Sequence, residues 1–262
     1  MASPNPKTKT IPLPGHFPNT TSDAQRVFDV LQLGGIAIVP TEIGYGLLAS
    51  SVEAIERAFS AKRRRPGHAH GLIGSYELHH ELHVLEPERF EMTRVLTHDL
   101  DMGLGIVAPY RADHPILAKF TPKTLANVVK DDTIAMFVGG GSLLREICRL
   151  NYEAGQVMVG SSANLSGGGQ KFLVEDIEEE IIEVADLIVD YGLQRYHVYG
   201  RASIVMDFGE MKVLRMGSCY ELFRERMGTH MLRYIRHTQG HRGRAIVASS
   251  HRLVRLKSAV PA

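Results

Sequence analysis

Residues 34–47 read GGIAIVPTEIGYGL, and this stretch decides the fold class of the chain. Its glycine pair ends the stretch 22–33, whose apolar residues recur with helical spacing behind a cap at Ser22 or Asp23. The apolar residues 36–39 then favour a short buried strand. The segment therefore predicts a helix that is followed at once by a strand.

The same change from helix to strand recurs along the chain. Further strands are expected at 71–75, 104–108, 133–138, 157–160, 187–189, 203–208 and 212–214. Further helices are expected at 52–61, 87–98, 142–150, 174–184 and from about 220. Alternation of apolar strands with amphipathic helices predicts a sheet that is covered on its faces, hence one main α/β domain.

Composition excludes several classes of protein. With 44% apolar and 23% charged residues among 262, the chain has ordinary globular values, which rules out disorder throughout and collagen. Two cysteines cannot build a disulfide framework or a four-cysteine zinc site. The apolar runs are too short to span a bilayer, and the first ten residues lack a secretory hydrophobic core. We expect a soluble, cytoplasmic protein with no membrane partner.

Charge is distributed unevenly along the chain. The formal net charge is +1, yet residues 224–262 contain nine basic residues and one acid and carry +8, which leaves −7 for the rest. Such a basic block is typical of a contact with RNA phosphates, and a merely solvated tail is an equally simple interpretation. We expect a mobile arm at 1–20, a folded domain at 21–223 and a basic C-terminal extension at 224–262.

Three segments carry candidate binding groups. Thr41, Glu42 and Tyr45 follow the strand 36–39, where loops of α/β sheets line ligand crevices, although a proline turn explains the same composition. The run Lys62-Arg63-Arg64-Arg65-Pro66 gathers cations that suit phosphate, or that cap a helix. The loop GSSANLSGGG at 160–169 offers hydroxyls, a carboxamide and close backbone approach to an anion, or is a linker.

Two further features are weaker. Ser203 and Arg215 would lie on adjacent strands if their segments pair as a hairpin, whereas a lone surface arginine is the simpler interpretation. His79 and His83 share one helical face, but their spacing does not match the HExxH pattern and nothing completes a metal-ligand set. No metal site is predicted.

Five pieces occur in one order: GGIAIVPTEIGYGL, KRRRP, GSSANLSG, ASIVMD and VLRMG. In this order the chain resembles the YrdC-like family of threonylcarbamoyl-adenylate synthases over residues 22–217. The resemblance implies an α/β fold with a twisted mixed sheet and flanking helices around a large cavity. It also implies synthesis of threonylcarbamoyl-AMP from threonine, bicarbonate and ATP, with release of pyrophosphate, for modification of tRNA.

The resemblance assigns roles to residues of this chain. Lys62 and Arg64 would hold carboxylate or phosphate oxygens, with Arg63 and Arg65 as the alternative register. Ser162 and Asn164 would complete the catalytic set by contacting the phosphates and the carbamate. Substrate-binding residues would be Thr41, Tyr45, Ser161, Ser203 and Arg215. Crowding a carboxylate, a carbamate and a triphosphate into one pocket requires cations, and Mg²⁺ bound to ATP would help.

The chain departs from the family pattern at functional positions. The usual PTDTVYGL has become PTEIGYGL, so Ile43 replaces a threonine and Gly44 a valine. The usual Arg-x-Pro before the serine loop is absent from residues 135–141. Loss of a hydroxyl or a cation from a polar pocket changes discrimination between substrates. The acceptor is therefore threonine or a related amine, and the alternative is a non-catalytic nucleotide- or RNA-binding relative or an assembly module.

Overall fold

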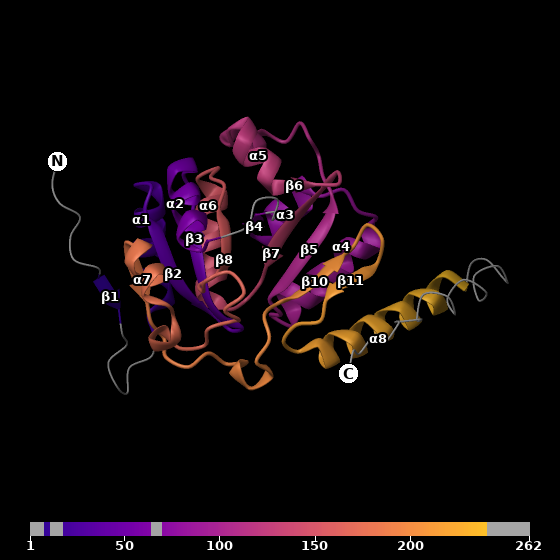
Figure 1. Cartoon of the computed structure of the whole chain (residues 1–262). Coiled ribbons are helices and arrows are strands. Elements are labelled where there is room, and N and C mark those ends of the chain that lie inside the picture. Colours follow the sequence, from indigo (N-terminus) through magenta and orange to yellow (C-terminus); the bar gives the residue numbers. More distant parts are fainter. Residues whose placement is uncertain (1–7, 11–17, 64–69, 240–262) are drawn as a thin grey trace. The chain divides into compact units, whose positions relative to one another are not determined.

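The computed structural model describes residues 8–10, 18–63 and 70–239 (Figure 1). The chain divides into two compact units, residues 1–220 and 221–262. The expected Arg64 and Arg65 lie outside the described residues, as does most of the expected arm. The described part of the second unit is the helix α8 (Tyr220–Gln239), which begins at the last residue of the first unit.

Eleven strands form one sheet in the described part of the first unit. They are β1 (Thr8–Thr10), β2 (Ile36–Thr41), β3 (Gly44–Ala49), β4 (Gly71–Ile73), β5 (Leu104–Pro109), β6 (Val129–Lys130), β7 (Thr133–Val138), β8 (Val159–Ser162), β9 (Leu187–Val189), β10 (Ile204–Asp207) and β11 (Lys212–Arg215). The helices are α1 (Thr20–Gln32), α2 (Val52–Ala61), α3 (Tyr76–Leu82), α4 (Pro87–Arg94), α5 (Pro122–Val128), α6 (Ser142–Glu153) and α7 (Glu179–Val184).

The sheet is mixed, as the resemblance to the YrdC-like family implies. Its order is β1-β9-β2-β3-β8-β4-β7-β5-β10-β11, with β6 paired to β7. The pairs β2·β3, β3·β8, β4·β8, β5·β7 and β10·β11 are antiparallel, while β2·β9, β4·β7 and β5·β10 are parallel. Strands far apart in the sequence are therefore neighbours in the sheet, which brings the distant motifs together.

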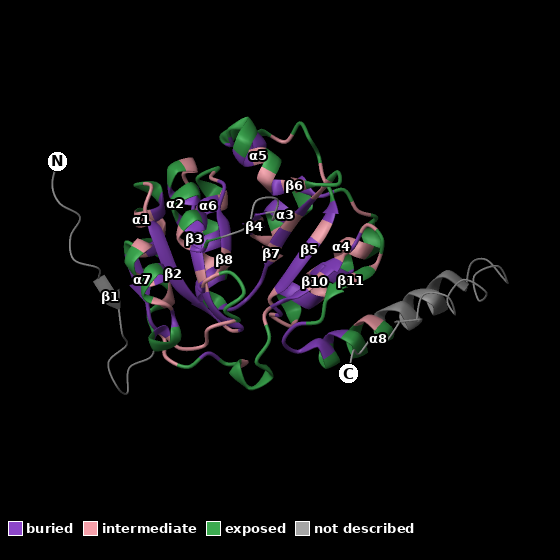
Figure 2. Cartoon of the chain, viewed as in Figure 1, coloured by how far each residue is buried: buried purple, intermediate pink, exposed green. Residues whose placement is uncertain are grey.

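Helices cover both faces of the sheet's first half (Figures 1 and 2). Ala37 and Val39 of β2 pack with α1 and α6 in one hydrophobic cluster. Ile36 and Ile38 point to the opposite face and are also fully buried, because side chains alternate along a strand. Burial on both faces explains why residues 36–39 are a continuous apolar run rather than an alternating one.

Capping side chains set where the helices begin. Ser51 Oγ accepts a hydrogen bond from Ala54 N at 3.1 Å, and α2 has the predicted bounds. The predicted cap at Ser22 or Asp23 is wrong, because the Asn19 carboxamide accepts from Ser22 N at 3.1 Å and starts α1 at Thr20. Helix α1 thus begins inside the expected arm, where β1 also pairs with β9.

Several other boundaries differ from the prediction; for example, the helix expected at 87–98 is α4 up to Arg94 and then a π-helical turn. The expected loop after β2 is a hairpin, since β3 pairs with β2 from Gly44 onward. Strand β8 extends to Ser162, so both serines of the expected loop belong to the sheet. The helix expected at 174–184 is a short 3-10 turn and then α7, because Ile177 has extended backbone angles between them.

No helix among the described residues is both long enough and apolar enough to cross a membrane.

Candidate functional site

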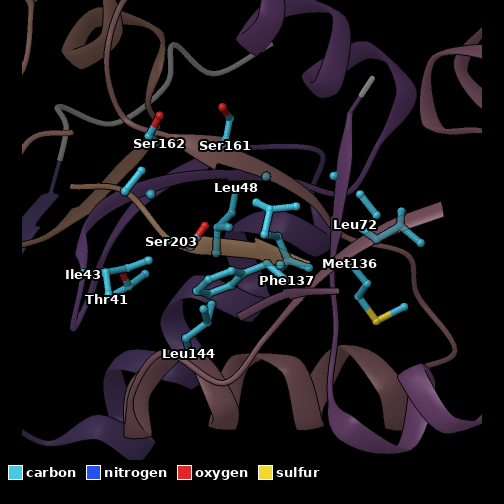
Figure 3. Close-up of a pocket in the computed structure, with 18 of the residues that line it drawn as sticks. Thr41, Ile43, Leu48, Leu72, Met136, Phe137, Leu144, Ser161, Ser162 and Ser203 are labelled. Atoms are coloured by element: carbon cyan, nitrogen blue, oxygen red, sulfur yellow. The ribbon is translucent and has the colours of Figure 1, made fainter. Parts of the chain in front are cut away.

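One cavity of about 270 Å³ lies over eight consecutive strands, from β2 to β11 in the sheet order (Figure 3). This volume is slightly below the range for small-molecule sites, which begins at roughly 300 Å³. Its wall includes six of the predicted site residues, namely Thr41, Tyr45, Ser161, Ser162, Ser203 and Arg215. Figure 3 shows the two β8 serines along one side and Phe137 and Leu144 along the other.

Charge is scarce in this wall. Arg215 is the one charged side chain among the described residues that line the cavity, and no carboxylate is among them. Its apolar members include Ile43, Leu48, Leu72 and Phe137. A guest with one anionic group and an apolar or neutral body matches such a surface, because the cation and the hydroxyls serve the anion and the apolar wall serves the remainder.

The β2–β3 turn forms one end of the cavity. Thr41 Oγ1 donates to Gly44 O and closes the turn, so this buried hydroxyl is engaged within the protein. Gly44 has φ +124°, a conformation that favours glycine. Ile43, which stands where a hydroxyl would be expected, is buried and presents an apolar surface to the cavity.

Tyr45 anchors the turn to the segment after β9. Its hydroxyl lies 2.9 Å from Asp190 Oδ1 and 2.8 Å from Gly192 O, and it accepts from Tyr191 N at 3.1 Å. Burial and the adjacent Asp190 carboxylate raise the pKa of Tyr45. This phenol therefore stays protonated and is committed to protein partners, which makes Tyr45 a wall residue rather than an acid or base.

Lys62 binds the backbone of the serine segment, residues 160–169. The ammonium donates to Ser162 O and Asn164 O, and the backbone carbonyl of Lys62 accepts from Ser166 N. Lys62 is 3% exposed and does not line the cavity. The Lys62 ammonium therefore contacts the backbone of the serine loop and not the cavity, where the sequence prediction placed it.

Asn164 follows the two serines in the sequence, and it does not line the cavity either. Its Nδ2 donates to Leu165 O, while its buried Oδ1 has no hydrogen-bond partner among the described residues. The hydroxyl groups of Ser161 and Ser162 are therefore the side chains of this motif that the structure places in the wall.

Ser203 and Arg215 form the pair that the sequence suggests. Strands β10 and β11 are antiparallel, and Arg215 donates from Nη2 to Ser203 Oγ at 2.7 Å and from Nε to Ser203 O at 2.8 Å. Arg215 has no carboxylate partner among the described ion pairs. Two of its five N–H donors are used, so the guanidinium retains donors for an anion.

The basic run after α2 is only partly described. Arg63, the alternative to Lys62 as the first binding cation, lies at the surface and pairs with Glu180 at 2.9 Å. Arg64 and Arg65 lie outside the described residues. The described part of the run thus adds no cation to the cavity wall.

Sequence reasoning missed Gln170. This residue follows the glycines of the serine loop, lines the cavity and donates from Nε2 to Tyr45 O at 3.1 Å. No signal within its own neighbourhood marks it, because its position depends on a contact with Gly44, 126 residues earlier in the chain. Only the pairing of β3 with β8 brings the two segments together.

His79 lies in α3, and His83 is the residue directly after its end, with extended backbone angles, yet the two side chains meet. Their Nδ1 atoms lie 2.6 Å apart, and both rings are fully buried. His79 Nε2 lies 2.9 Å from Thr93 Oγ1 and His83 Nε2 lies 3.1 Å from Ile134 O, so all four ring nitrogens have protein partners. No group of three metal-binding side chains is present among the described residues.

Comparison with solved structures supports the fold. The chain is similar to the hypothetical protein smu.1377c from Streptococcus mutans, with a TM-score of 0.70 and 20% identity over 86% of this chain and 96% of the other. It is similar to Sua5 from P. abyssi complexed with L-threonine, with a TM-score of 0.61 and 22% identity over 80% and 56%. The corresponding values for E. coli YciO are 0.59, 16%, 81% and 95%.

Sequence comparison gives the family. No curated protein sequence matches the chain. The family model Sua5_yciO_yrdC, described as "Telomere recombination", matches residues 29–217, a region that begins in α1 and ends two residues after Arg215. This region contains all the described residues of the cavity wall and covers well over half of the sequence. The chain therefore belongs to the Sua5/YciO/YrdC family.

Proposed function

We propose that the protein is a nucleotidyltransferase that forms a carbamoyl-adenylate from an amino acid, bicarbonate and ATP, with release of pyrophosphate. The observation that carries this proposal is the convergence of Ser161, Ser162, Ser203 and Arg215 on one cavity. Hydroxyl donors and a guanidinium without a carboxylate partner suit an anionic guest. Family membership and the likeness to a threonine-bound Sua5 support the choice of an amino-acid substrate.

The proposed reaction has two balanced steps. The amine nitrogen of the amino acid forms a bond to the carbon of bicarbonate, and water leaves after proton transfer, which gives a carbamate. A carbamate oxygen then attacks the α-phosphorus of ATP, and the bond between the α-phosphorus and the bridging oxygen breaks. The electron pair of that bond leaves with pyrophosphate.

Positioning and charge neutralisation do most of the work in such a reaction. Arg215, oriented by two hydrogen bonds to Ser203, would hold a phosphate or carboxylate oxygen. The Ser161 and Ser162 hydroxyls would donate to oxygens on the other side of the guest. Lys62 would keep this strand end in place by binding its carbonyls, so that Ser162 needs no rearrangement during the reaction.

Mg²⁺ has no ligand pair in the described cavity wall, because no carboxylate is among its residues. The ion prefers oxygen ligands and commonly binds substrate phosphates together with one or two carboxylates. The residues present therefore do not fit a protein-held magnesium site. We accordingly derive no step from a protein-bound metal, and any Mg²⁺ would enter as a counter-ion on the phosphates of ATP.

The proposal is tested by incubating the protein with ATP, bicarbonate and a panel of amino acids while pyrophosphate is measured. We expect release that depends on both bicarbonate and one class of amino acid. Ser162→Ala and Arg215→Ala should each reduce kcat/KM by about 5-fold to 150-fold, since each removes a neutral or charged donor worth about 1–3 kcal/mol.

Arg149→Ala is the matched control for Arg215→Ala. Arg149 lies on α6, outside the cavity wall, and pairs with Glu146 and Glu153 at the surface. Its removal should leave turnover unchanged. Absence of pyrophosphate with every amino acid, or full activity of the Ser162 and Arg215 variants, would contradict the proposal.

A second candidate is a non-catalytic relative that binds a nucleotide or RNA. It is favoured by the single charged side chain in the described wall, because a triphosphate carries several negative charges. Binding of AMP or ATP that is lost in Arg215→Ala, without pyrophosphate release from any amino acid, would favour this candidate over the enzyme.

A further inference from the structure

At the turn end of the cavity, the Gln170 side chain fills the space that a side chain at residue 44 would need. A Cβ atom at residue 44 would lie 2.2 Å from Gln170 Nε2, 2.6 Å from its Cγ and 2.7 Å from its Cδ. These distances are far below van der Waals contact. The absence of a side chain at residue 44 is therefore what allows the Gln170 carboxamide to lie over the turn and reach the cavity wall.

The backbone and the side chain of this segment are both fixed. Tyr45 N donates to Lys171 O at 2.8 Å, which holds the chain directly after Gln170 against β3. Gln170 Nε2 donates to Tyr45 O, and that carbonyl also accepts from Ala163 N at 2.9 Å. Lys171 in turn pairs with Glu178 at 2.9 Å. The carboxamide is thus oriented before any guest arrives.

The orientation leaves one group of the carboxamide available. Nε2 is engaged by Tyr45 O, whereas Oε1 accepts no hydrogen bond among the described residues. Gln170 is half-buried in the cavity wall, beside the buried apolar Ile43. This end of the cavity therefore combines an apolar surface with one fixed, neutral hydrogen-bond acceptor.

The chemistry of the acceptor selects a class of guest. A neutral carboxamide oxygen suits a neutral donor such as a hydroxyl group. A cationic side chain would meet no carboxylate among the described residues of the wall, and burial of an uncompensated cation is costly. An apolar side chain of the same size would leave Oε1 desolvated and unpaired, which disfavours it.

We propose that Gln170 is a specificity-determining residue, and that its Oε1 accepts a hydrogen bond from the side-chain hydroxyl of a β-hydroxy amino acid. This inference rests on the proposed function, because it deepens the assignment of the amino-acid site. In this proposal the contact with Gly44 places Gln170 so that it can recognise a hydroxyl group. The residue of the turn itself, Ile43, is apolar and cannot do so.

Direct binding to the full chain tests the proposal with two isosteric pairs, L-threonine against L-valine and L-serine against L-2-aminobutyrate. Calorimetry should show that the protein prefers the hydroxy amino acid of each pair by at least about tenfold, the effect of about one hydrogen bond. Gln170→Met keeps the length of the side chain and removes the acceptor. It should reduce the preference to about twofold or less and leave valine affinity nearly unchanged.

Two further variants separate the specific effect from a general one. Gly44→Ala should displace the Gln170 carboxamide and lose the same preference while Gln170 is still present. Gln156→Met is the matched control, because Gln156 is also half-buried but bonds Gln32 away from the cavity wall. It should keep the full preference.

Several results would overturn the proposal: no binding of any of the four amino acids, no preference in the unmodified protein, or an unchanged preference in Gln170→Met. Pyrophosphate release from the same samples tests the reaction separately. A hydroxyl preference that depends on Gln170 without pyrophosphate release would contradict the proposed reaction and support the assignment of Gln170.

Discussion

Lys62 serves the cavity without lining it. Its ammonium binds two carbonyls of the serine segment, about one hundred residues later in the chain. A run of four cations in sequence favours a direct contact with phosphate. The sequence does not show which of the four side chains is buried in the protein. The first of them is buried against the serine segment, and the second is a surface partner of Glu180.

Lys62→Met tests this positioning role. The substitution keeps most of the aliphatic stem and removes the ammonium donor from Ser162 O, which still accepts from Asn164 N at 3.0 Å, and from Asn164 O. We expect a loss of about 1–3 kcal/mol in the free energy of unfolding, since two buried carbonyls lose a charged partner. Under the proposed function kcat should fall more than KM rises, whereas Lys62→Arg should recover part of kcat. Unchanged stability and kcat in urea unfolding and turnover assays would contradict the role.

The buried pair His79 and His83 is neutral in the folded protein. Desolvation lowers the pKa of His79 to about 2 and that of His83 to about 4, and the neighbouring His83 adds to the effect on His79. If His83 Nε2 donates to Ile134 O, its Nδ1 accepts from His79 Nδ1, and His79 Nε2 accepts from the Thr93 hydroxyl. The Thr93 hydroxyl lies 2.9 Å from His79 Nε2 and 2.8 Å from Phe90 O, and its single proton can be donated to only one of the two.

This pair predicts acid sensitivity. Below pH 6.5, the ordinary histidine value, the unfolded chain binds protons that the folded protein does not, so stability is present above pH 6.5 and falls toward pH 4. Each histidine adds a slope of about 1.4 kcal/mol per pH unit over that window. The double variant His79→Leu/His83→Leu should flatten the slope in urea unfolding, while His98→Leu, at an exposed site, should not. Equal slopes in all three proteins would contradict this interpretation.

The helices and strands follow the sequence where local signals agree. The buried strand 36–39 and the helix Val52–Ala61 lie where apolar periodicity, glycines and a serine cap all point to the same boundary. Pairing decides the rest. Residues 44–49 carry three glycine or alanine positions and look like a loop, yet they form β3 because β2 and β8 supply partners on either side.

The candidate site was predictable in its parts and not in its geometry. Serines, Tyr45 and Arg215 could be selected from motifs, and the β10–β11 hairpin that joins Ser203 to Arg215 could be expected from two adjacent strands. The commitment of the Tyr45 hydroxyl to Asp190, and the presence of Gln170, could not. Both depend on contacts across more than one hundred residues, which local patterns do not encode.

Gly217 tests the importance of the β10–β11 hairpin. A Cβ atom at this residue would lie 2.2 Å from Ile204 N and from Ser203 C, backbone atoms that cannot move independently of the strand. Gly217→Ala should therefore destabilise the protein by about 1–3 kcal/mol and reduce turnover by displacing Ser203. Gly228→Ala is the control, since nothing lies within 4 Å of its added Cβ. Equal unfolding midpoints for both variants would contradict the packing described here.

The C-terminal unit, residues 221–262, has nine basic and two acidic residues and carries +7, whereas residues 1–220, which form the sheet and the cavity, carry −6. If this basic unit binds RNA phosphates, deletion of residues 233–262 should flatten the dependence of log affinity on log salt, by about 0.7 for each lost contact with a single strand. Fluorescence anisotropy with labelled RNA measures the slope. The same slope in the full and shortened chains would exclude this segment as the contact.

The central claim is that eight neighbouring strands bring groups from distant motifs together around one anionic guest. Its most direct test uses ¹³C-bicarbonate with ATP and L-threonine or L-serine, and mass spectrometry of the products. We predict an adenylate that carries the amino acid and one ¹³C atom, and whose formation is lost in Arg215→Ala. Pyrophosphate or AMP without incorporation of ¹³C, or labelled product of equal yield from Arg215→Ala, would contradict the claim.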